Sequence, residues 1–222
     1  MSTRQKIVFC DFDGTITVSD NIVAIMKHFD PPGWEAIVKR LVEERAISVR
    51  HAVGEMFRLL PSSRQHEVIE FAISNAVIRE GFADFVAYCR QNGIKLLVTS
   101  GGIDFFVYPL LESFDIPREH IYCNGSSFEG ETIEILWPHA CDEHCGADCG
   151  MCKTSIIRSY PADDYERILI GDSVTDFQGA KLVENVYARS HLIELCEELK
   201  LPYVPFETFH DIIRDLEAKI QA

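Results

Sequence analysis

Three segments of the chain carry side chains that suit the chemistry of phosphate esters. Asp11 and Asp13 lie in a DFDGT run, Ser100 lies in TSGG, and Asp172 and Asp176 lie in GDSVTD. The carboxylate oxygens of Asp11, Asp13 and Asp172 are hard ligands, which suit Mg²⁺ better than a softer metal. A hydroxyl followed by glycine amides can hydrogen-bond phosphate oxygens at the start of a helix. These residue types therefore predict magnesium-assisted phosphoryl transfer.

A lysine between the last two of these segments, Lys153, adds a fixed positive charge. Phosphoryl transfer requires in-line geometry and neutralisation of the charge on the transferred group. We therefore predict that Ser100, Gly101 and Lys153 bind the phosphoryl group. Taken alone, a DxD sequence is often a turn and an SGG sequence is often a loop. Three such segments in this order, with the lysine between them, favour the catalytic interpretation.

Each of the three segments follows a short apolar run that predicts a buried strand, at residues 7–10, 95–99 and 168–170. Helices are predicted between and after them at residues 82–92, 105–114 and 175–183, and further strands at 186–188 and 203–205. Strands that alternate with amphipathic helices indicate an α/β fold with a doubly wound parallel sheet. Ligands bind at the carboxyl ends of the strands in such a sheet, so the three segments are expected to converge there.

Two stretches interrupt this alternation. From residue 17 to residue 81, apolar residues recur at helical spacing, and Pro-Pro-Gly at 31–33 and Pro-Ser-Ser at 61–63 divide the stretch into several helices. We therefore predict a catalytic core formed by residues 1–16 and 82–222 and a helical cap formed by residues 17–81. A small hairpin is predicted at 126–136. Trp34 and Phe57 either line the tail of a substrate or, as aromatics at helical spacing, belong to the core of the cap, and the second interpretation is favoured.

The charge and the start of the chain limit its partners. The formal net charge is −14, which repels nucleic acid and anionic membranes, so a small-molecule phosphate ester is the expected partner. A bound divalent cation would reverse the local charge for such a substrate. The first apolar run, Ile7 to Cys10, is too short for an export signal or a membrane span, which predicts a cytoplasmic protein. The sequence does not indicate an oligomeric state.

Half of the eight cysteines lie in one short segment. Cys141, Cys145, Cys149 and Cys152 follow a C-x3-C-x3-C-x2-C spacing, with His139 and His144 interleaved. A structural Zn²⁺ site is one interpretation, although zinc sites usually contain two CxxC pairs and only the last two cysteines form one. A loop of reduced thiols or an adventitious disulfide is the alternative. Cys10, Cys89, Cys123 and Cys196 lie in apolar surroundings and are predicted to be core residues.

With these motifs the chain resembles the haloacid dehalogenase superfamily. DFDGT, TSGG, Lys153 and GDSVTD are similar to the four motifs of that superfamily, and the resemblance extends over nearly the whole chain. It implies a Rossmann-like core with an inserted helical cap. It also implies a phosphatase reaction through a phospho-aspartyl intermediate, in which Asp11 is the nucleophile. Asp13 would be the general acid/base, which protonates the leaving alcohol and then activates water.

The same resemblance assigns the ligands. Mg²⁺ would be held by the side chains of Asp11 and Asp172 and by the backbone carbonyl of Asp13. Asp176 would orient Lys153 or a metal-bound water, while Lys153 and the TSGG serine would bind the phosphoryl group.

Two branches of the superfamily compete for the substrate. TSGGIDFFV followed by a hairpin resembles the phosphoserine phosphatases, whose cap carries a glutamate and an arginine that pairs with the substrate carboxylate. Alignment on the Leu59-Leu60 pair places Asp20 at the glutamate position and Met56 at the arginine position. Methionine cannot pair with a carboxylate but suits a thioether or alkyl tail. Arg58 lies close by in the sequence and is the alternative partner for a carboxylate.

The remaining segments resemble a different branch. DFDGTIT with Asp20-Asn21, LLPSS at 59–63, IREGF at 78–82, DFFVYPLLE at 104–112 and WPH at 137–139 are similar to the bacterial 2-hydroxy-3-keto-5-methylthiopentenyl-1-phosphate phosphatases of methionine salvage. That resemblance implies a substrate with a methylthio tail and no carboxylate, which agrees with Met56.

Other functions remain open at this point. A dehalogenase or a phosphonate hydrolase on the same fold is one alternative. Asp13 disfavours the dehalogenase, because halide leaves without needing a proton. A non-catalytic, zinc-binding interaction protein is disfavoured because every catalytic group is present.

Overall fold

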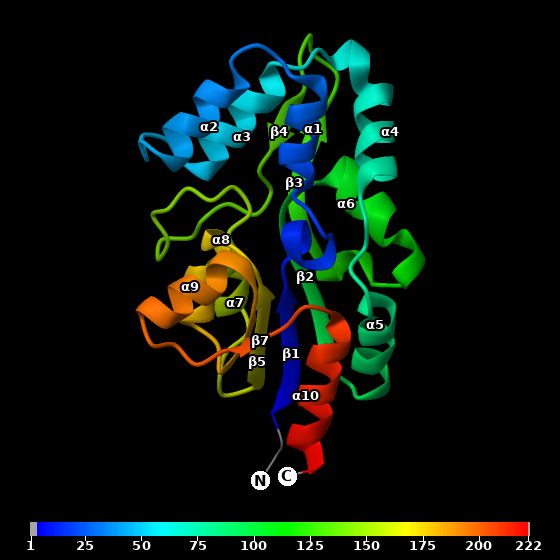
Figure 1. Ribbon diagram of the computed structural model, residues 1–222, viewed down its shortest axis with the longest axis vertical. Coiled ribbons are helices and arrows are strands. Elements are labelled where there is room, and N and C mark those ends of the chain that lie inside the picture. The colour runs from blue at the N-terminus through cyan, green and yellow to red at the C-terminus, as the bar shows by residue number, and fades with distance from the viewer. Residues whose placement is uncertain (1–3, 222) are drawn as a thin grey trace.

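The computed structural model describes residues 4–221 and is built around one sheet (Figure 1). Its strand order is β4-β3-β2-β1-β5-β6-β7, and every described pairing is parallel except that of β3 with β4. The doubly wound α/β prediction is therefore confirmed. The strands are β1 (Gln5–Cys10), β2 (Lys95–Ile103), β3 (Ile121–Ser127), β4 (Glu134–Leu136), β5 (Tyr165–Gly171), β6 (Asn185–Ala188) and β7 (Val204–Pro205).

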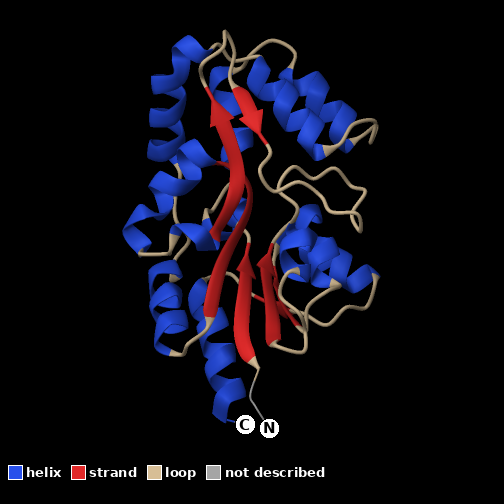
Figure 2. Cartoon of the chain, turned by 180° about the vertical axis from the view of Figure 1, so that it is seen from behind, coloured by secondary structure: helices blue, strands red, loops and turns tan. Residues whose placement is uncertain are grey.

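Helices cover both faces of the sheet, because both faces of the central strand are apolar. Along β1, Val8 and Cys10 belong to one hydrophobic cluster, whereas Ile7 and Phe9 belong to the other. The first cluster includes residues of α5 (Phe82–Gln91), α6 (Asp104–Leu111) and α10 (Phe209–Gln221). The second includes residues of α7 (Lys153–Arg158), α8 (Val174–Ala180) and α9 (Ser190–Glu198). Figures 1 and 2 show these helices on opposite sides of the strands.

The segment 17–81 contains four α-helices: α1 (Asn21–Phe29), α2 (Trp34–Val42), α3 (Val49–Arg58) and α4 (Gln65–Asn75). They lie beyond the carboxyl end of β1, at the opposite end of the molecule from the two termini (Figure 1). Phe57 is fully buried, and Trp34 packs against the same apolar cluster. Since that cluster also contains residues from the sheet, the helical segment and the sheet share one hydrophobic core.

Several element boundaries differ from the sequence-based expectations. The hairpin expected at 126–136 is the antiparallel pairing of β4 with the end of β3, and β3 starts earlier, at Ile121. This strand was missed because its sequence, IYCNGSS, contains polar residues and glycine that weaken the strand signal. The helix expected at 175–183 ends at Ala180, where Leu182 closes a tight turn by donating to the Gly179 carbonyl. Among the helices within 4–221, none combines the length and apolarity needed to cross a membrane.

Candidate active site

Strand register brings the three polar segments to one edge of the sheet. Cys10 at the end of β1 pairs with Val98 on β2 and with Ile170 on β5. The three polar segments therefore lie at the same level: DFDGT follows β1, TSGG lies in the second half of β2, which runs on to Ile103, and GDSVTD begins at the last residue of β5. The Asp11 amide donates to the Ile170 carbonyl at 2.9 Å, which fixes the start of the first segment against β5.

Lys153 links two of these segments through a buried ion-pair network. It is the first residue of α7, and its Nζ lies 2.5 Å from Asp11 Oδ1. The same ammonium donates to Asp176 Oδ1. All three side chains are buried, with relative exposures of 5% for Asp11, 4% for Lys153 and 0% for Asp176. The two carboxylates raise the pKa of Lys153 against the opposing effect of burial, so the lysine stays charged.

Asp176 is held by the start of α8. Its Oδ2 accepts the backbone amides of Asp172 and Ser173, each at 3.1 Å, and Ser173 and Asp176 form a capping box. Both Asp176 oxygens are thus engaged, one by the turn and one by Lys153. This arrangement fits the expected supporting role of Asp176 and leaves the other carboxylates to face a ligand.

The donor set fits a hard divalent cation. Carboxylate oxygens of Asp11, Asp172 and Asp176 all lie within 4.8 Å of one another. Burial and the neighbouring carboxylates raise the pKa values of Asp11 and Asp172, because Lys153 alone does not offset three clustered negative charges. A cation between Asp11 and Asp172 would remove that repulsion, and oxygen ligands are those that Mg²⁺ prefers.

The turn after Asp11 is held by two arginines that no sequence motif indicates. Arg79 Nη2 and Arg189 Nη1 both donate to the Gly14 carbonyl at 2.8 Å, and Arg79 Nε donates to the Thr15 carbonyl at 2.6 Å. Gly14 has a φ of +80°, and a Cβ there would lie 2.3 Å from Asp172 Oδ2. A glycine is therefore required for the turn to approach Asp172 this closely.

Asp13 lies in a setting that suits proton transfer. Its Oδ1 accepts hydrogen bonds from the Asn21 backbone amide at 3.0 Å and from Asn21 Nδ2 at 2.7 Å. Burial, assisted by the charge of Asp20, raises the pKa of Asp13 to about 7. A carboxyl group with that pKa can both donate and accept a proton near neutral pH. Asn21, which starts α1, is a further residue that the motif analysis missed.

The TSGG segment presents a buried hydroxyl and an open backbone. Ser100 is buried, and its Oγ accepts the Gly102 amide at 2.9 Å. Apart from its two chain neighbours, no residue within 4–221 has a heavy atom within 4 Å of a Cβ placed on Gly101, so a ligand has space beside that residue. Asn124 Nδ2, on β3, donates to the Gly101 carbonyl at 2.7 Å and fixes the orientation of this peptide. Asn124 had no motif to indicate it.

The two residues expected at the substrate tail lie in the helical segment. Asp20 is exposed and caps α1, where its Oδ1 accepts the Val23 amide at 2.9 Å. Met56 on α3 is buried with Phe57 in the large apolar cluster. Asp20 therefore adjoins the Asp13–Asn21 contact, whereas the Met56 side chain belongs to the core of the helical segment. Their role toward a substrate tail stays a prediction.

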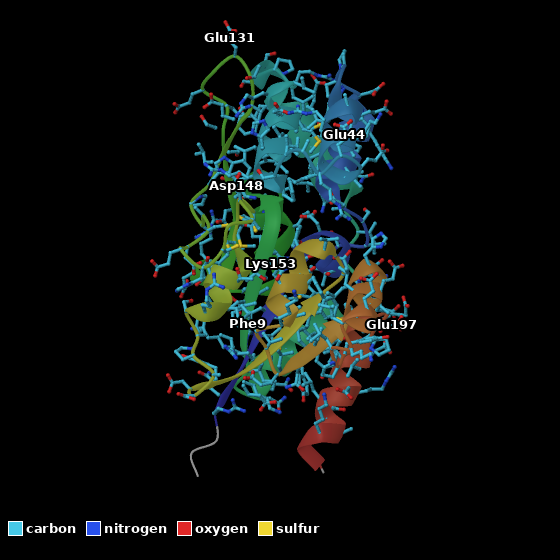
Figure 3. All side chains as sticks on the ribbon, turned by 90° about the vertical axis from the view of Figure 1, so that its left-hand side faces the viewer. Phe9, Glu44, Glu131, Asp148, Lys153 and Glu197 are labelled. Carbon is cyan, nitrogen blue, oxygen red and sulfur yellow. The ribbon has the colours of Figure 1, made fainter. Side chains whose placement is uncertain are left out.

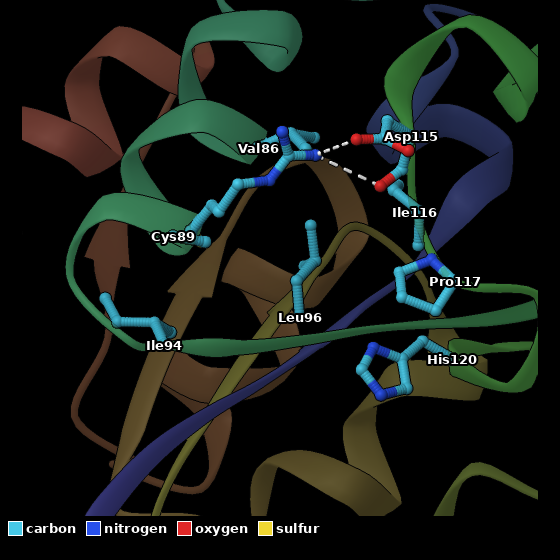
Figure 4. A pocket seen from close by; sticks show the side chains of 9 residues that line it. Val86, Cys89, Ile94, Leu96, Asp115, Ile116, Pro117 and His120 are labelled. Carbon is cyan, nitrogen blue, oxygen red and sulfur yellow. Dashed lines mark hydrogen bonds and ion pairs between the residues drawn. The ribbon is translucent and has the colours of Figure 1, made fainter.

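A pocket of about 350 Å³ lies away from these groups (Figure 4). It is lined by residues of α5, by Leu96 near the start of β2 and by the segment 115–120, and an Arg90–Asp115 ion pair at 2.8 Å borders it. Leu96 precedes Ser100 along the same parallel strand, so this pocket lies toward the amino end of β2. It does not contain the converging carboxylates.

The four clustered cysteines converge beside Lys153. The Sγ atoms of Cys141, Cys145, Cys149 and Cys152 all lie within 4.8 Å of one another, and Cys152 directly precedes the lysine. Sulfur atoms gather between the labelled Asp148 and Lys153 in Figure 3. All eight cysteines are free thiols in this structure. The other four cysteines are buried in the hydrophobic clusters, as expected.

Sequence comparison identifies relatives over nearly the whole chain. The family profile of the haloacid dehalogenase-like hydrolases matches residues 8–181. A protein of Brevibacillus brevis named 2-hydroxy-3-keto-5-methylthiopentenyl-1-phosphate phosphatase is 55% identical, over 97% of this chain and 96% of that protein. A protein of the same name from Geobacillus kaustophilus is 53% identical, over 97% of each chain.

Structural comparison gives a matching fold. A solved structure titled as the phospho-aspartyl intermediate analogue of phosphoserine phosphatase superimposes with a TM-score of 0.70 at 18% identity. The match covers 96% of this chain and 99% of that one. A substrate-bound phosphoserine phosphatase gives the same TM-score at 17% identity. These likenesses establish a shared architecture of sheet and helices.

Proposed function

Because the chain belongs to the haloacid dehalogenase-like hydrolase family, we propose that it is a Mg²⁺-dependent phosphatase acting on 2-hydroxy-3-keto-5-methylthiopentenyl-1-phosphate in methionine salvage. The product would be the acireductone 1,2-dihydroxy-3-keto-5-methylthiopentene. Relatives with about half of their residues identical over nearly the full length carry that activity in their names. The observation that carries the proposal is Lys153 held between Asp11 and Asp176, beside an Asp13 whose pKa is about 7.

In the first step, a carboxylate oxygen of Asp11 attacks the phosphorus atom. The new oxygen–phosphorus bond forms an aspartyl phosphate, and the bond from phosphorus to the ester oxygen breaks in line with it. The neutral carboxyl group of Asp13 donates its proton to the departing oxygen. The two Asn21 hydrogen bonds to Asp13 Oδ1 hold the acid in place and leave Oδ2 free to transfer the proton.

In the second step, the Asp13 carboxylate accepts a proton from water. The water oxygen attacks the phosphorus atom, and the bond between phosphorus and Asp11 breaks. Phosphate leaves, Asp11 is regenerated as a carboxylate and Asp13 is again protonated. Asp13 thus acts first as an acid and then as a base, which requires a pKa near the working pH.

The remaining residues bind and position the phosphoryl group. Ser100, the Gly101 amide and Lys153 would contact its oxygens. Asp176 is a positioning residue, which acts through Lys153. Mg²⁺ would be held by the side chains of Asp11 and Asp172 and by the backbone carbonyl of Asp13. When bound, it neutralises negative charge on the carboxylates and on the phosphate.

Substrate choice is assigned to the helical segment. We propose that residues 17–81 act as a cap over a core of residues 1–16 and 82–222, and that Asp20 and Met56 influence selection of the tail. The second candidate is a phosphoserine phosphatase, which the likeness of fold favours. Met56 opposes it, because a thioether offers no charge to a substrate carboxylate.

A substrate panel tests the assignment. The values of kcat/KM are measured with Mg²⁺ for the methylthiopentenyl phosphate, phosphoserine and pyridoxal phosphate. We expect the first to be highest. Equal or faster turnover of phosphoserine contradicts the assignment, and the absence of turnover of every phosphate ester contradicts the phosphatase activity itself.

A further inference from the structure

The segment 137–152 is long and irregular, and something must hold its shape. It contains no helix or strand in the described chain and joins β4 to α7. Irregular stretches of this length are uncommon in compact domains unless a function or a ligand orders them. Asp148 and Gly150, on either side of Cys149, have φ values of +51° and +85°. These two left-handed residues turn the chain sharply at Cys149, which returns toward Cys141.

The four sulfur atoms are spaced for one metal ion. Zn–S bonds are about 2.3 Å long, so tetrahedral geometry places the sulfurs about 3.8 Å apart. All four sulfurs lie within 4.8 Å of one another, which fits a mononuclear site. A multi-iron cluster would hold them further apart, because its ligands bind different metal atoms.

The interleaved histidines are engaged elsewhere. The His139 ring packs edge-on against the Tyr122 ring, with centroids 5.1 Å apart. His144 is exposed and pairs with Glu143 at 3.6 Å. The cluster therefore offers four thiols as ligands, and thiolates in a tetrahedral arrangement select zinc or iron over hard cations.

Hydrogen bonds around the cluster support such a site. The Cys149 amide donates to Cys141 Sγ at 3.4 Å. Asp142 is fixed to α7 at both ends, since its amide donates to Ser155 Oγ at 3.0 Å and Arg158 Nε donates to its carboxylate at 2.9 Å. Contacts of this kind orient metal ligands and set their affinity.

We propose that Cys141, Cys145, Cys149 and Cys152 bind one Zn²⁺ ion, which holds Lys153 in position and fastens the segment 137–152 to α3. On binding, each thiol releases its proton to solvent and its sulfur forms one bond to the ion, so four protons are exchanged for one zinc. The site itself does not depend on the proposed function. Its effect on catalysis rests on the proposed function of Lys153.

Two sets of contacts connect the cluster with the rest of the molecule. On one side, Cys152 is the N-cap residue of α7, and its amide donates to the His139 carbonyl at 2.8 Å directly before Lys153. On the other side, Asp148 accepts hydrogen bonds from Ser48 Oγ at 2.6 Å and from Arg50 Nη1 at 3.2 Å at the start of α3. A bound ion would thus order the lysine and a helix of the segment 17–81 together.

Metal content of the intact protein tests the site. The chain is purified under reducing conditions without added metal, and zinc and iron are measured by elemental analysis. We expect about one zinc per chain. Replacement of zinc by Co²⁺ should give the intense near-ultraviolet charge-transfer absorption of thiolate ligands. Cys145→Ser, at a half-buried ligand eight positions before Lys153 in the sequence, should lose most of the metal. The control Cys196→Ala, on the buried face of α9, should retain it.

The coupling to Lys153 has its own measurement. Zinc is released from the wild type with an organomercurial and the thiols are then freed with excess reductant, while Mg²⁺ is kept in the buffer. Hydrogen exchange of residues 137–158 and 48–58 should become at least about tenfold faster, and KM should rise more than kcat falls. Restored zinc should reverse both effects. Exchange that is unchanged after zinc release overturns the coupling.

The site itself is overturned by a wild-type protein that contains no metal and has four titratable thiols in this segment, or disulfides among them by mass spectrometry. Iron in place of zinc overturns the assignment of the ion. Metal content, thiol state and hydrogen exchange do not depend on phosphate-ester turnover, so failure of the zinc site and failure of the proposed phosphatase function are distinguishable.

Discussion

Lys153 Nζ lies 2.5 Å from Asp11 Oδ1, although 142 positions separate the two residues in the sequence. The same ammonium also contacts Asp176, so one buried cation joins the segment after β1 to the segment after β5. Lys153 therefore connects the proposed nucleophile, the phosphate site and the start of α8. Its contacts should affect both the activity and the stability of the protein.

The nucleophile assignment predicts the effect of Asp11→Asn. The change removes the attacking carboxylate and one metal charge with almost no change in volume. We expect kcat to fall by at least about a thousandfold, with the circular dichroism spectrum preserved. Trapping with beryllium fluoride should occur on the wild type alone. Retention of a tenth of the wild-type rate, with deamidation to aspartate excluded by mass spectrometry, contradicts the assignment.

Loss of the Lys153 charge should destabilise the fold in a pH-dependent way. Lys153→Met leaves Asp11 and Asp176 buried without a cation, which costs about 3–5 kcal/mol of unfolding free energy. Burial and like charge already raise the pKa of Asp11 above its unfolded value. The folded variant therefore binds a proton that the unfolded chain releases, so its stability is greatest in acid and falls as the pH rises through the raised pKa.

Chemical denaturation at several pH values checks this expectation. The stability difference between Lys153→Met and the wild type should be larger at pH 8 than at pH 5. Lys181→Met, which removes an exposed lysine, is the control and should change stability by less than about 0.5 kcal/mol. A stability difference that does not vary with pH would mean that loss of Lys153 leaves the protonation of Asp11 in the folded state unchanged.

Removal of the divalent cation should abolish activity. The clustered carboxylates and the net charge of −14 repel a phosphate ester unless a cation intervenes. EDTA should therefore reduce the rate to background, and Mg²⁺ should restore it. Zinc content is measured in the same samples, because thiolate-bound zinc should survive a brief EDTA treatment. Activity that persists after exhaustive chelation is incompatible with the mechanism.

The pKa of Asp13 predicts the pH dependence. Leaving-group protonation needs the neutral carboxyl group, and that form is lost as the pH rises above about 7. The value of kcat/KM should accordingly fall about tenfold per pH unit on the alkaline side. Asp20→Asn removes a neighbouring negative charge while keeping a residue that can cap α1, so the break should move to lower pH. If kcat/KM begins to fall at the same pH in the variant as in the wild type, the charge of Asp20 does not raise the pKa of Asp13.

The sequence predicted the reactive residues better than the residues that hold them. Asp11, Ser100 and Asp172 each follow an apolar run, and the carboxyl-terminal parts of parallel strands lie at one edge of a sheet, so their meeting could be foreseen. Arg79 and Arg189 bind a backbone carbonyl, an interaction that any arginine can make and that has no motif. Their contacts depend on loops from three distant parts of the chain, which pattern analysis does not place.

Strand β3 and the contact made by the Asn124 side chain escaped prediction for the same reason. Asn124 lies within β3, and the polar residues that follow it obscured that strand. The Asn124 side chain binds the Gly101 carbonyl, so this part of the sequence has the polar residue that the site requires and not the apolar residue typical of a strand.

Met56 shows the opposite case, in which the residue type suggested a functional role that packing can also explain. Its type suggested a substrate contact, whereas its burial among apolar residues also explains it as part of the core.

Substrate selection provides the last prediction. A substrate carboxylate facing a thioether in a closed pocket would remain unpaired, which costs about 2–5 kcal/mol. The wild type should therefore prefer the methylthiopentenyl phosphate over phosphoserine by roughly thirtyfold to several thousandfold in kcat/KM. Met56→Arg should weaken the methylthio substrate and improve phosphoserine turnover.

Because Met56 is only 5% exposed, an arginine there also disturbs packing, so thermal unfolding must accompany the kinetics. Met56→Leu is the matched control, since it keeps an apolar side chain of similar volume and should retain the preference. Arg58→Ala tests the neighbouring cation, which is exposed at the end of α3. If Arg58 binds a carboxylate, phosphoserine turnover falls in that variant while the methylthio substrate is unaffected. Equal efficiency of the wild type on both substrates would mean that Met56 does not select the tail and that the chain is better assigned as a phosphoserine phosphatase.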